Sequence, residues 1–316
     1  MAGEMEPVPG WGVAVPKAQG ESHRRRLREQ GVLDPTLRPR VEGDTLLLPV
    51  REPVPGAREY LFVPFDPRGP PLPRHELIGG IAVMQEPDAG EAERLLHSRP
   101  SIHTVLCAES EVEGEFRTRR YRVLAGDPTT ATRYREHGLV LDIDLAVAYF
   151  SPRLATERQR LASRVRPGER VLDMFAGVGP CALSLGRRGA WVAAADLNPS
   201  AVHLMVHNCR LNRIRSVTPF FADARHLRGI GLPLFDRVVM NLPLGFRSFL
   251  DDAWALCRPG GTIHVYALQE EAGQFTPLLE AHGAERVEER EVRTYSPGRW
   301  HAVYDVVRST GSNLVP

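Results

Sequence analysis

The chain of 316 residues is long enough for about two domains, and its 42% hydrophobic and 25% charged residues are typical of a folded globular protein. Its 40 basic and 39 acidic side chains give a formal net charge of +1, which excludes the strongly basic profile of a protein that coats nucleic acid. Lys17 is the single lysine, which agrees either with a GC-rich genome or with selection of arginine for phosphate contacts.

The N-terminal residues lack the basic and apolar parts of a secretion signal, and nowhere do about 18 apolar residues follow one another. The four cysteines stand far apart without a C-x-x-C pair, so neither a disulfide framework nor a zinc site is indicated. We therefore expect a cytoplasmic protein without a membrane span or a bound metal. No protein partner is evident, so we expect a monomer.

Residues 1–70 are predicted to form a small N-terminal domain, with a helix at Glu21–Gln30 and a strand at Asp44–Val50. Five prolines from Pro64 to Pro73 predict a linker or a stiff loop. Residues 71–148 alternate short β-type runs with turn signals around one helix, which predicts a small α/β middle domain. Its expected elements are strands at Ile78–Met84, Thr104–Ala108, Arg119–Leu124 and Leu139–Leu145 and a helix at Glu91–His97.

The last part of the chain, residues 149–316, alternates apolar strands with helices. The expected strands are Arg170–Phe175, Trp191–Leu197, Val217–Phe221, Phe235–Met240 and Thr262–Leu268, and the expected helices are Pro180–Arg188, Pro199–Leu211, Phe246–Cys257 and Gln269–His282. Two β-rich runs, Glu288–Thr294 and Trp300–Val307, follow. This order predicts a doubly wound α/β sheet that binds ligands beyond the carboxyl ends of its strands.

The loop after the first of these strands contains Gly177 and Gly179, which let the backbone approach a ligand closely, and Pro180, which suits the first turn of a helix. Such a G-x-G-x-x-A pattern is weak evidence, because dinucleotide-binding dehydrogenases have it too. Asp196 ends the second strand, where a carboxylate can accept hydrogen bonds from a ribose diol. NAD and S-adenosylmethionine both meet this requirement.

The next two loops carry Asp223-Ala224 and Asn241-Leu242-Pro243. An Asp-Ala pair there can present a carboxylate and an amide to an adenine edge, although Asp223 alone could equally be a helix cap or turn residue. Asn-Leu-Pro after the fourth strand is typical of methyltransferases that act on amino groups or ring nitrogens. Together the loops favour S-adenosylmethionine over NAD.

Residues 117–170 hold 12 arginines and 6 acidic residues, a local excess of +6. A positive segment beside a cofactor-binding fold suits a polyanionic substrate, although it could also be an ordinary solvated face. Glu157 lies within it, as either an ion-pair partner of Arg153 or Arg158 or a general base near the cofactor.

Five segments together resemble the tRNA (guanine-37-N1)-methyltransferase family, particularly its archaeal members. They are Tyr149-Phe-Ser-Pro-Arg-Leu-Ala-Thr-Glu-Arg158, Asp173-Met-Phe-Ala-Gly-Val-Gly-Pro180, Asp196-Leu-Asn-Pro199, Asn208-Cys-Arg-Leu-Asn212 and Met240-Asn-Leu-Pro243. Gly114–Arg119 is similar to the family's middle-domain motif, and Val15–Gly20 through Leu46–Pro49 to its N-terminal domain. The resemblance implies a Rossmann-like class I methyltransferase domain preceded by a small α/β middle domain and a small N-terminal domain that contacts tRNA.

The resemblance also implies S-adenosylmethionine as cofactor and tRNA with guanosine at position 37 as substrate. Glu157 would remove the N1 proton of the guanine and Arg117 would stabilise charge on its oxygen. Tyr149, Asn241 and Pro243 would shape the pocket for the extruded base. The positions expected to bind the cofactor are Arg158, Asp173, Phe175, Gly177, Gly179, Asp196, Leu197, Asp223, Ala224 and Asn241, and those expected to bind RNA are Arg119 and Arg153.

Cys181, where the family usually has phenylalanine, and Leu244-Gly245-Phe246-Arg247 depart from the family pattern. Wyosine-pathway enzymes share the fold and remain alternatives. One type transfers the aminocarboxypropyl group of the same cofactor but typically lacks the Ser-Pro-Arg and Asn-Leu-Pro motifs, and another also methylates a tricyclic intermediate. A catalytically silent RNA-binding protein is a further alternative, against which the intact motif residues argue.

Overall fold

The computed structural model describes residues 6–64, 72–111 and 114–311 of the chain. It divides into two compact units, Met1–Leu72 and Pro73–Pro316. The expected proline-rich linker falls largely on residues 65–71, outside the described residues. The predicted boundary between residues 148 and 149 lies inside the second unit, and the division into three domains stays a prediction.

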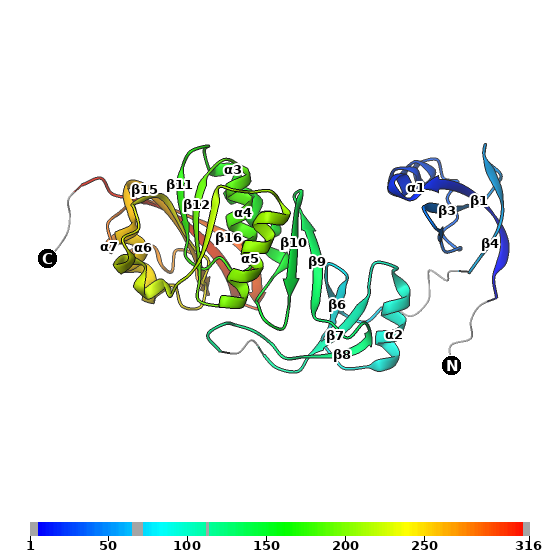
Figure 1. Cartoon of the computed structure of the whole chain (residues 1–316), viewed down its shortest axis with the longest axis horizontal. Helices are drawn as coiled ribbons and strands as arrows, with labels where there is room; N and C mark the ends of the chain where they lie inside the picture. Colours follow the sequence, from blue (N-terminus) through cyan, green and yellow to red (C-terminus); the bar gives the residue numbers. More distant parts are fainter. Residues whose placement is uncertain (1–5, 65–71, 112–113, 312–316) are drawn as a thin grey trace. The chain divides into compact units, whose positions relative to one another are not determined.

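The first unit is a four-stranded antiparallel sheet with one helix (Figure 1). Its strand order is β2 (Arg40–Glu42), β3 (Thr45–Val50), β1 (Val8–Pro16), β4 (Ala57–Phe62). Helix α1 (Gly20–Glu29) is polar except for the stripe that buries Leu27 against Val15 and Leu48 of the sheet. The helix and the β3 strand predicted from sequence are therefore present, and β1, β2 and β4 are additional.

The second unit begins with a four-stranded mixed sheet, followed by a separate hairpin. The sheet consists of β5 (His75–Ile78), β6 (Ile81–Met84), β7 (Thr104–Ala108) and β8 (Tyr121–Gly126), with α2 (Ala89–Ser98) packed on it, and the hairpin of β9 (Ala131–Glu136) and β10 (Leu139–Asp144). The prediction of one strand over Ile78–Met84 is wrong. Gly79, with φ of +59°, turns the chain there and makes two antiparallel strands.

A seven-stranded sheet forms the rest of the unit, in the order β13 (Val217–Phe221), β12 (Trp191–Asp196), β11 (Arg170–Asp173), β14 (Phe235–Met240), β15 (Cys257–Gln269), β17 (Arg299–Arg308), β16 (Ala284–Ser296). The first five strands are parallel and β17 runs antiparallel to both of its neighbours. Val238, Val239 and Met240 of β14 are fully buried, as expected for a central strand covered on both faces.

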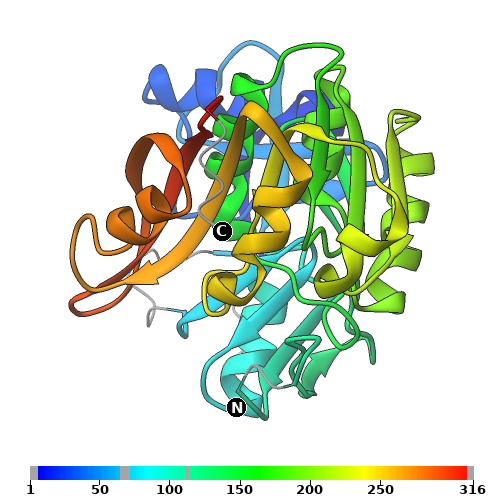
Figure 2. The ribbon, with the colours of Figure 1, turned by 90° about the vertical axis from the view of Figure 1, so that its left-hand side faces the viewer.

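Helices cover both faces of this sheet (Figure 2). One face carries α3 (Ala155–Arg164), α4 (Pro180–Arg187) and α5 (Pro199–Leu211), and the other carries α6 (Leu250–Leu256), α7 (Thr276–Ala281) and two short 3-10 segments, Ala224–Ile230 and Phe246–Phe249. Helix α7 is far shorter than the predicted Gln269–His282, because β15 continues to Gln269 and turns occupy the residues before Thr276. The doubly wound α/β class is confirmed.

Candidate active site

A cavity opens at the carboxyl ends of β11, β12, β13 and β14, where the strand order reverses beside β11. Ligands of open α/β sheets bind at this switch point. The predicted site residues that line it are Arg117, Tyr149, Arg158, Phe175, Gly177, Asp196, Leu197, Asp223, Ala224, Asn241 and Pro243. Those that lie outside its lining are Glu157, Asp173, Gly179, Arg119 and Arg153.

Gly177 and Asp196 form the turn at the floor of the cavity. Gly177 has a φ of +56°, and its amide donates to the Asp196 carboxylate at 2.7 Å. A Cβ atom added to Gly177 would meet only the carbonyl oxygen of Tyr149, at 3.8 Å, so the space over this glycine is open to a ligand. Burial raises the pKa of Asp196, and the amides of Asn198 and Gly177 oppose that shift.

Gly179 serves the fold at this turn, as the left-handed N-cap of α4 before Pro180. A Cβ atom there would stand 2.6 Å from Leu183 and 2.7 Å from Met205, which leaves no room for a side chain. Gly179 therefore packs the turn against helices α4 and α5 and does not face the cavity.

Asp173 ends β11 directly behind the cavity and is 1% exposed. Its Oδ1 accepts a weak hydrogen bond from the Phe175 amide at 3.4 Å, and its Oδ2 is buried with no hydrogen-bond partner among the described residues. Burial raises the pKa of Asp173 to about 7, and the charge of Asp196 adds to that shift. A buried carboxylate oxygen without a partner fits a site that receives a cationic group.

Asp223 caps the 3-10 segment that begins at Ala224, with its side chain accepting from the Arg225 amide at 2.9 Å. The helix-cap interpretation is thus correct, and the residue also lines the cavity. Arg225 binds the same carboxylate and reaches Glu115 at 3.0 Å across the opening. The residues therefore fit S-adenosylmethionine: an open glycine turn, a carboxylate for the ribose, an unpaired carboxylate oxygen for its ammonium group and a polar end for adenine.

The other end of the cavity is formed by Arg117, Tyr149, Asn241 and Pro243. The Arg117 guanidinium lies 5.2 Å from the centroid of the Tyr149 ring, and the Arg117 backbone has a left-handed φ of +55°. Non-glycine residues in this region are uncommon and concentrate at functional sites. His301 of β17 completes this end and was not identified from the sequence.

Arg158 lines the cavity but binds protein groups. Its guanidinium forms a buried, two-point ion pair with Glu136 of β9, at 2.7 and 2.5 Å, and donates to the Ser151 carbonyl at 3.1 Å. It therefore fixes α3 and the segment before it to the β9–β10 hairpin. Arg153 is likewise paired with Glu76 of β5 at 2.7 Å, and the Arg119 Nε is buried without a hydrogen-bond partner in the described part of the chain.

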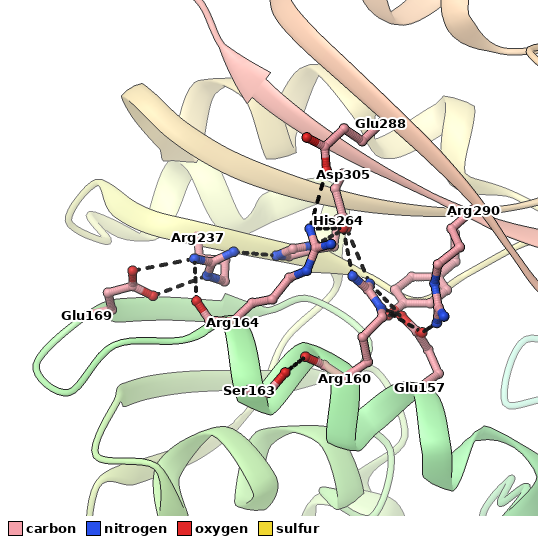
Figure 3. A network of polar contacts seen from close by, with 11 residues as sticks. Glu157, Arg160, Ser163, Arg164, Glu169, Arg237, His264, Glu288, Arg290 and Asp305 are labelled. Carbon is pink, nitrogen blue, oxygen red and sulfur yellow. Dashed lines mark hydrogen bonds and ion pairs between the residues drawn. The ribbon is translucent and has the colours of Figure 1, made fainter.

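Glu157 lies on α3 and is 4% exposed, in a network of ion pairs behind the cavity lining (Figure 3). Its carboxylate accepts hydrogen bonds from Arg160 at 2.6 Å, from the Tyr266 hydroxyl at 2.8 Å and from Arg290. The ion-pair partners that the sequence suggested, Arg153 and Arg158, bind other carboxylates instead. Whether Glu157 is a general base stays a prediction.

The same network continues through Asp305 to a buried histidine (Figure 3). Asp305 accepts from Arg160 at 2.7 Å, from Arg164 at 2.8 Å and from the Nδ1 of His264 at 2.5 Å. The Nε2 of His264 lies 2.8 Å from a guanidinium nitrogen of Arg237, which can only donate, so His264 is neutral with its proton on Nδ1. Burial lowers the pKa of His264, in agreement with a neutral ring.

The fold and the cavity together define a class of protein. A dinucleotide-binding sheet has the strand order 3-2-1-4-5-6, whereas here the antiparallel β17 lies between β15 and the last strand, β16. With the open glycine turn and the acidic residues at the strand ends, this is a class I methyltransferase that uses S-adenosylmethionine.

Comparison with known proteins places the chain within that class. Residues 132–291 match the TRM5/TYW2 methyltransferase domain, and residues 12–58 match the tRNA methyltransferase 5 N-terminal domain. The chain belongs to the TRM5/TYW2 methyltransferase family.

Two relatives and one solved structure illustrate how similar this chain is to known members of the family. The tRNA (guanine(37)-N(1))-methyltransferase Trm5b of Pyrococcus abyssi is 35% identical over 93% of this chain and 97% of its own length. The tRNA(Phe) (4-demethylwyosine(37)-C(7)) aminocarboxypropyltransferase of Methanocaldococcus jannaschii is 28% identical over 73% of this chain and 96% of its own length. The solved complex of aTrm5 and tRNALeu superimposes with a TM-score of 0.69 at 27% identity, covering 94% of this chain and 99% of that one.

Proposed function

We propose that this protein transfers a methyl group from S-adenosylmethionine to N1 of guanosine 37 of tRNA. The observation that carries the proposal is the 35% identity to Trm5b over nearly the full length of both chains. The match of residues 12–58 to the tRNA methyltransferase 5 N-terminal domain supports methyl transfer over the related aminocarboxypropyl transfer. The protein is thus a tRNA (guanine(37)-N1)-methyltransferase that binds tRNA.

The cofactor half of the cavity would hold S-adenosylmethionine, which supplies a methyl group activated by a sulfonium. Asp196 would accept hydrogen bonds from the ribose hydroxyls of the cofactor, and the open space over Gly177 would admit its methionine part. The unpaired Oδ2 of Asp173 would accept from its ammonium group. Asp223 and Ala224 would bind the adenine edge, with Phe175 and Leu197 beside it.

The other half would receive the extruded guanine between Tyr149, Asn241 and Pro243. Guanine N1 holds its proton at neutral pH, so the proton must leave before N1 can attack. Arg117 would stabilise the negative charge that then develops on the guanine oxygen. In-line attack on the methyl group depends mainly on how the two reactants are positioned.

Glu157 is the proposed acceptor of the N1 proton. Because its carboxylate lies behind the cavity lining, the bound guanine must gain access to it, and Arg290, whose side chain is 48% exposed, is the partner best able to move away. Arg160, whose side chain is only 14% exposed, and the buried Tyr266 would keep the carboxylate oriented. Arg119 and Arg153, whose side chains are 37% and 56% exposed, are proposed to contact the RNA backbone.

No helix within the described residues is long and apolar enough to cross a membrane. Within the same residues, no group of three or more His, Cys, Asp or Glu side chains is placed to hold a metal ion. We further propose that the enzyme acts as a monomer in the cytoplasm, as the sequence suggested.

The proposal is tested by incubating the protein with methyl-labelled S-adenosylmethionine and an unmodified tRNA transcript that carries guanosine at position 37. Digestion and mapping should locate the label on N1 of that nucleoside. A matched transcript with adenosine at position 37 serves as the control and should remain unlabelled. Label at another position would contradict the proposal, and so would an unlabelled tRNA, which is the result that transfer of the aminocarboxypropyl group would give because the labelled methyl group then stays on the sulfur.

A further inference from the structure

A second pocket lies at the end of the seven-stranded sheet opposite to the cavity. We call it the tryptophan patch, and the residues that line it are Gly186, Arg187, Trp191, Asn212, Arg213, Ile214, Arg215 and Ser216. Trp191 begins β12 and Asp196, which lines the cavity, ends it, so the two places are about 17 Å apart along the strand. A nucleotide bound in the cavity therefore cannot also occupy the patch.

Trp191 presents a large aromatic surface to solvent. The residue is 62% exposed, and its ring stacks on no other aromatic ring and on no guanidinium in the described part of the chain. Tryptophan rings are usually buried or placed at interfaces, where their large flat surface contributes most to binding. The free face of Trp191 is thus available to a flat ligand group.

Three exposed arginines surround this ring, namely Arg187, Arg213 and Arg215. None of them forms a hydrogen bond or an ion pair with another described residue, and the residues that line the patch include no acidic side chain. Many other arginines of this unit bind carboxylates of the fold. The three guanidiniums of the patch therefore keep their N–H donors for a ligand.

Arg213 occupies a backbone position that favours glycine. It follows Asn212, the C-cap of α5, and has a left-handed φ of +58°. Helices commonly end on glycine in this conformation, because other residues are strained there. The attraction of a cation to a helix C-terminus does not exceed the cost of such a backbone, so the helix end alone does not account for this arginine.

The combination of free guanidiniums and a free aromatic face selects among polyanions. Guanidiniums bind phosphates through paired N–H donors, and an exposed aromatic ring stacks on any base. Single-stranded nucleic acid offers phosphates and base faces together, whereas a duplex hides its base faces. An acidic protein segment would pair with the arginines but would leave the face of Trp191 without a partner.

We propose that the tryptophan patch binds a single-stranded segment of RNA, with its phosphates on the arginines and a base stacked on Trp191. It is a second RNA-binding site, separate from the cavity that receives nucleotide 37. The choice of RNA rests on the proposed function, because it is made for a protein that acts on tRNA. Binding at the patch itself requires no methyl transfer and can be measured without it.

The test measures, by fluorescence anisotropy, how tightly the full-length protein binds a labelled oligouridylate of about ten nucleotides. Oligouridylate forms little internal structure, so its bases are free to stack. Trp191→Ala should weaken binding about fivefold or more, the lower limit for the loss of one stacked base. Trp191→Phe keeps an aromatic ring and should retain most of the affinity.

A second set of variants tests the contacts to phosphate. Arg213→Gly removes a guanidinium and should fold at least as well as the wild type, because glycine suits the left-handed backbone. Each lost phosphate contact should reduce the slope of log Kd against log salt concentration by about 0.7, and Arg215→Gln should add a second such loss. The matched control is Arg286→Gln, which removes an exposed arginine that pairs with Glu288 on β16 and should change neither affinity nor slope.

Oligouridylate binding that is unchanged in both Trp191→Ala and Arg213→Gly would overturn the inference. An oligoglutamate of equal charge that binds as tightly as the RNA, and equally well to Trp191→Ala, would also overturn it, because the patch would then suit an acidic protein. Should Trp191→Ala fail to fold, Arg213→Gly decides the question.

Methyl transfer is measured separately with saturating tRNA, and Trp191→Ala should react at the wild-type rate because the patch lies away from the cavity. A wild-type enzyme that methylates no tRNA would contradict the proposed function and leave the oligouridylate result unaffected. The two proposals therefore fail in different measurements.

Discussion

Replacing Asp305 with asparagine tests whether the ion-pair network behind the cavity stabilises the fold. The carboxylate, on β17, binds Arg160, Arg164 and His264 at 2.7, 2.8 and 2.5 Å. Asparagine preserves the shape but removes the charge, so Arg160, whose side chain is 14% exposed, keeps only Glu157 as its ion-pair partner. The amide must also satisfy the His264 N–H with its single oxygen.

Removing one partner of a buried ion pair typically costs about 3–5 kcal/mol. The Arg164 contact contributes little of this, because that side chain is 45% exposed and solvent screens its charge. The loss should therefore be about 3 kcal/mol. For a unit of this size it corresponds to a fall of roughly 6–12 °C in Tm.

Urea unfolding at pH 7, followed by tryptophan fluorescence, measures this loss directly. The matched control is Glu270→Gln, which breaks the exposed pair between Glu270 and Arg299 at 3.2 Å and should cost less than about 1 kcal/mol. A loss below about 1 kcal/mol for Asp305→Asn would refute the assignment of the network as a stabilising element.

The stabilisation that Asp305 provides should depend on pH in a defined direction. Burial alone would raise the pKa of Asp305, but the hydrogen bonds from His264 and Arg160 lower it overall. A lowered carboxyl pKa contributes stability that is complete above the unfolded value of about 3.9 and is lost as the pH falls through the folded value. The difference between wild type and Asp305→Asn should thus be full at pH 7 and shrink below about pH 4.

Three further variants test the site. Glu157→Gln should lower single-turnover methyl transfer by about 100-fold or more, the scale of a positioned proton acceptor, and leave cofactor binding by calorimetry nearly intact; unchanged chemistry would remove Glu157 from that role. Asp196→Ala should weaken binding of S-adenosylmethionine, and normal binding would contradict the ribose assignment. Burial raises the pKa of Asp173 to about 7, so the affinity of the enzyme for S-adenosylmethionine should fall as the pH drops from 8 to 6. Asp173→Asn should bind the cofactor weakly and with a flatter dependence on pH. The same pH dependence in the wild type and the variant would disprove the contact.

The parallel strands could be predicted from the sequence because each contains a short apolar run, and the central strands β11 and β14 are buried along most of their length. Helix α5 was predicted with its observed bounds, since Asn198 caps it through the amides of Ser200 and Ala201 and Pro199 occupies the first turn. Helix α3 was missed because its buried face includes Glu157 and Arg158. Ion pairs replace apolar contacts on that face, so hydrophobic periodicity gives no signal there.

The site was predicted where it depends on the parallel strands, because their carboxyl ends necessarily meet at one edge of the sheet. His301 and Tyr266 could not be assigned in the same way. His301 comes close to Pro243 only because β17 is inserted next to β15, a strand order that the sequence does not specify. Tyr266, within an apolar strand, is indistinguishable by pattern from an ordinary core residue, although its hydroxyl binds Glu157.

The arginines of residues 117–170 have a different main role from the binding of a polyanionic substrate that their charge alone suggested. Several of its arginines bind carboxylates within the fold: Arg133 with Asp142, Arg153 with Glu76, Arg158 with Glu136, Arg160 with Glu157 and Asp305, and Arg164 with Asp305 and Glu288. Arginine suits this role, since its planar fork binds two acceptors at once. Within this segment, RNA contacts are therefore expected from the arginines around Arg117, at the cavity mouth, and from Arg153, whose side chain is 56% exposed despite its pair with Glu76. The salt dependence of tRNA binding should accordingly be smaller than the excess of +6 implies.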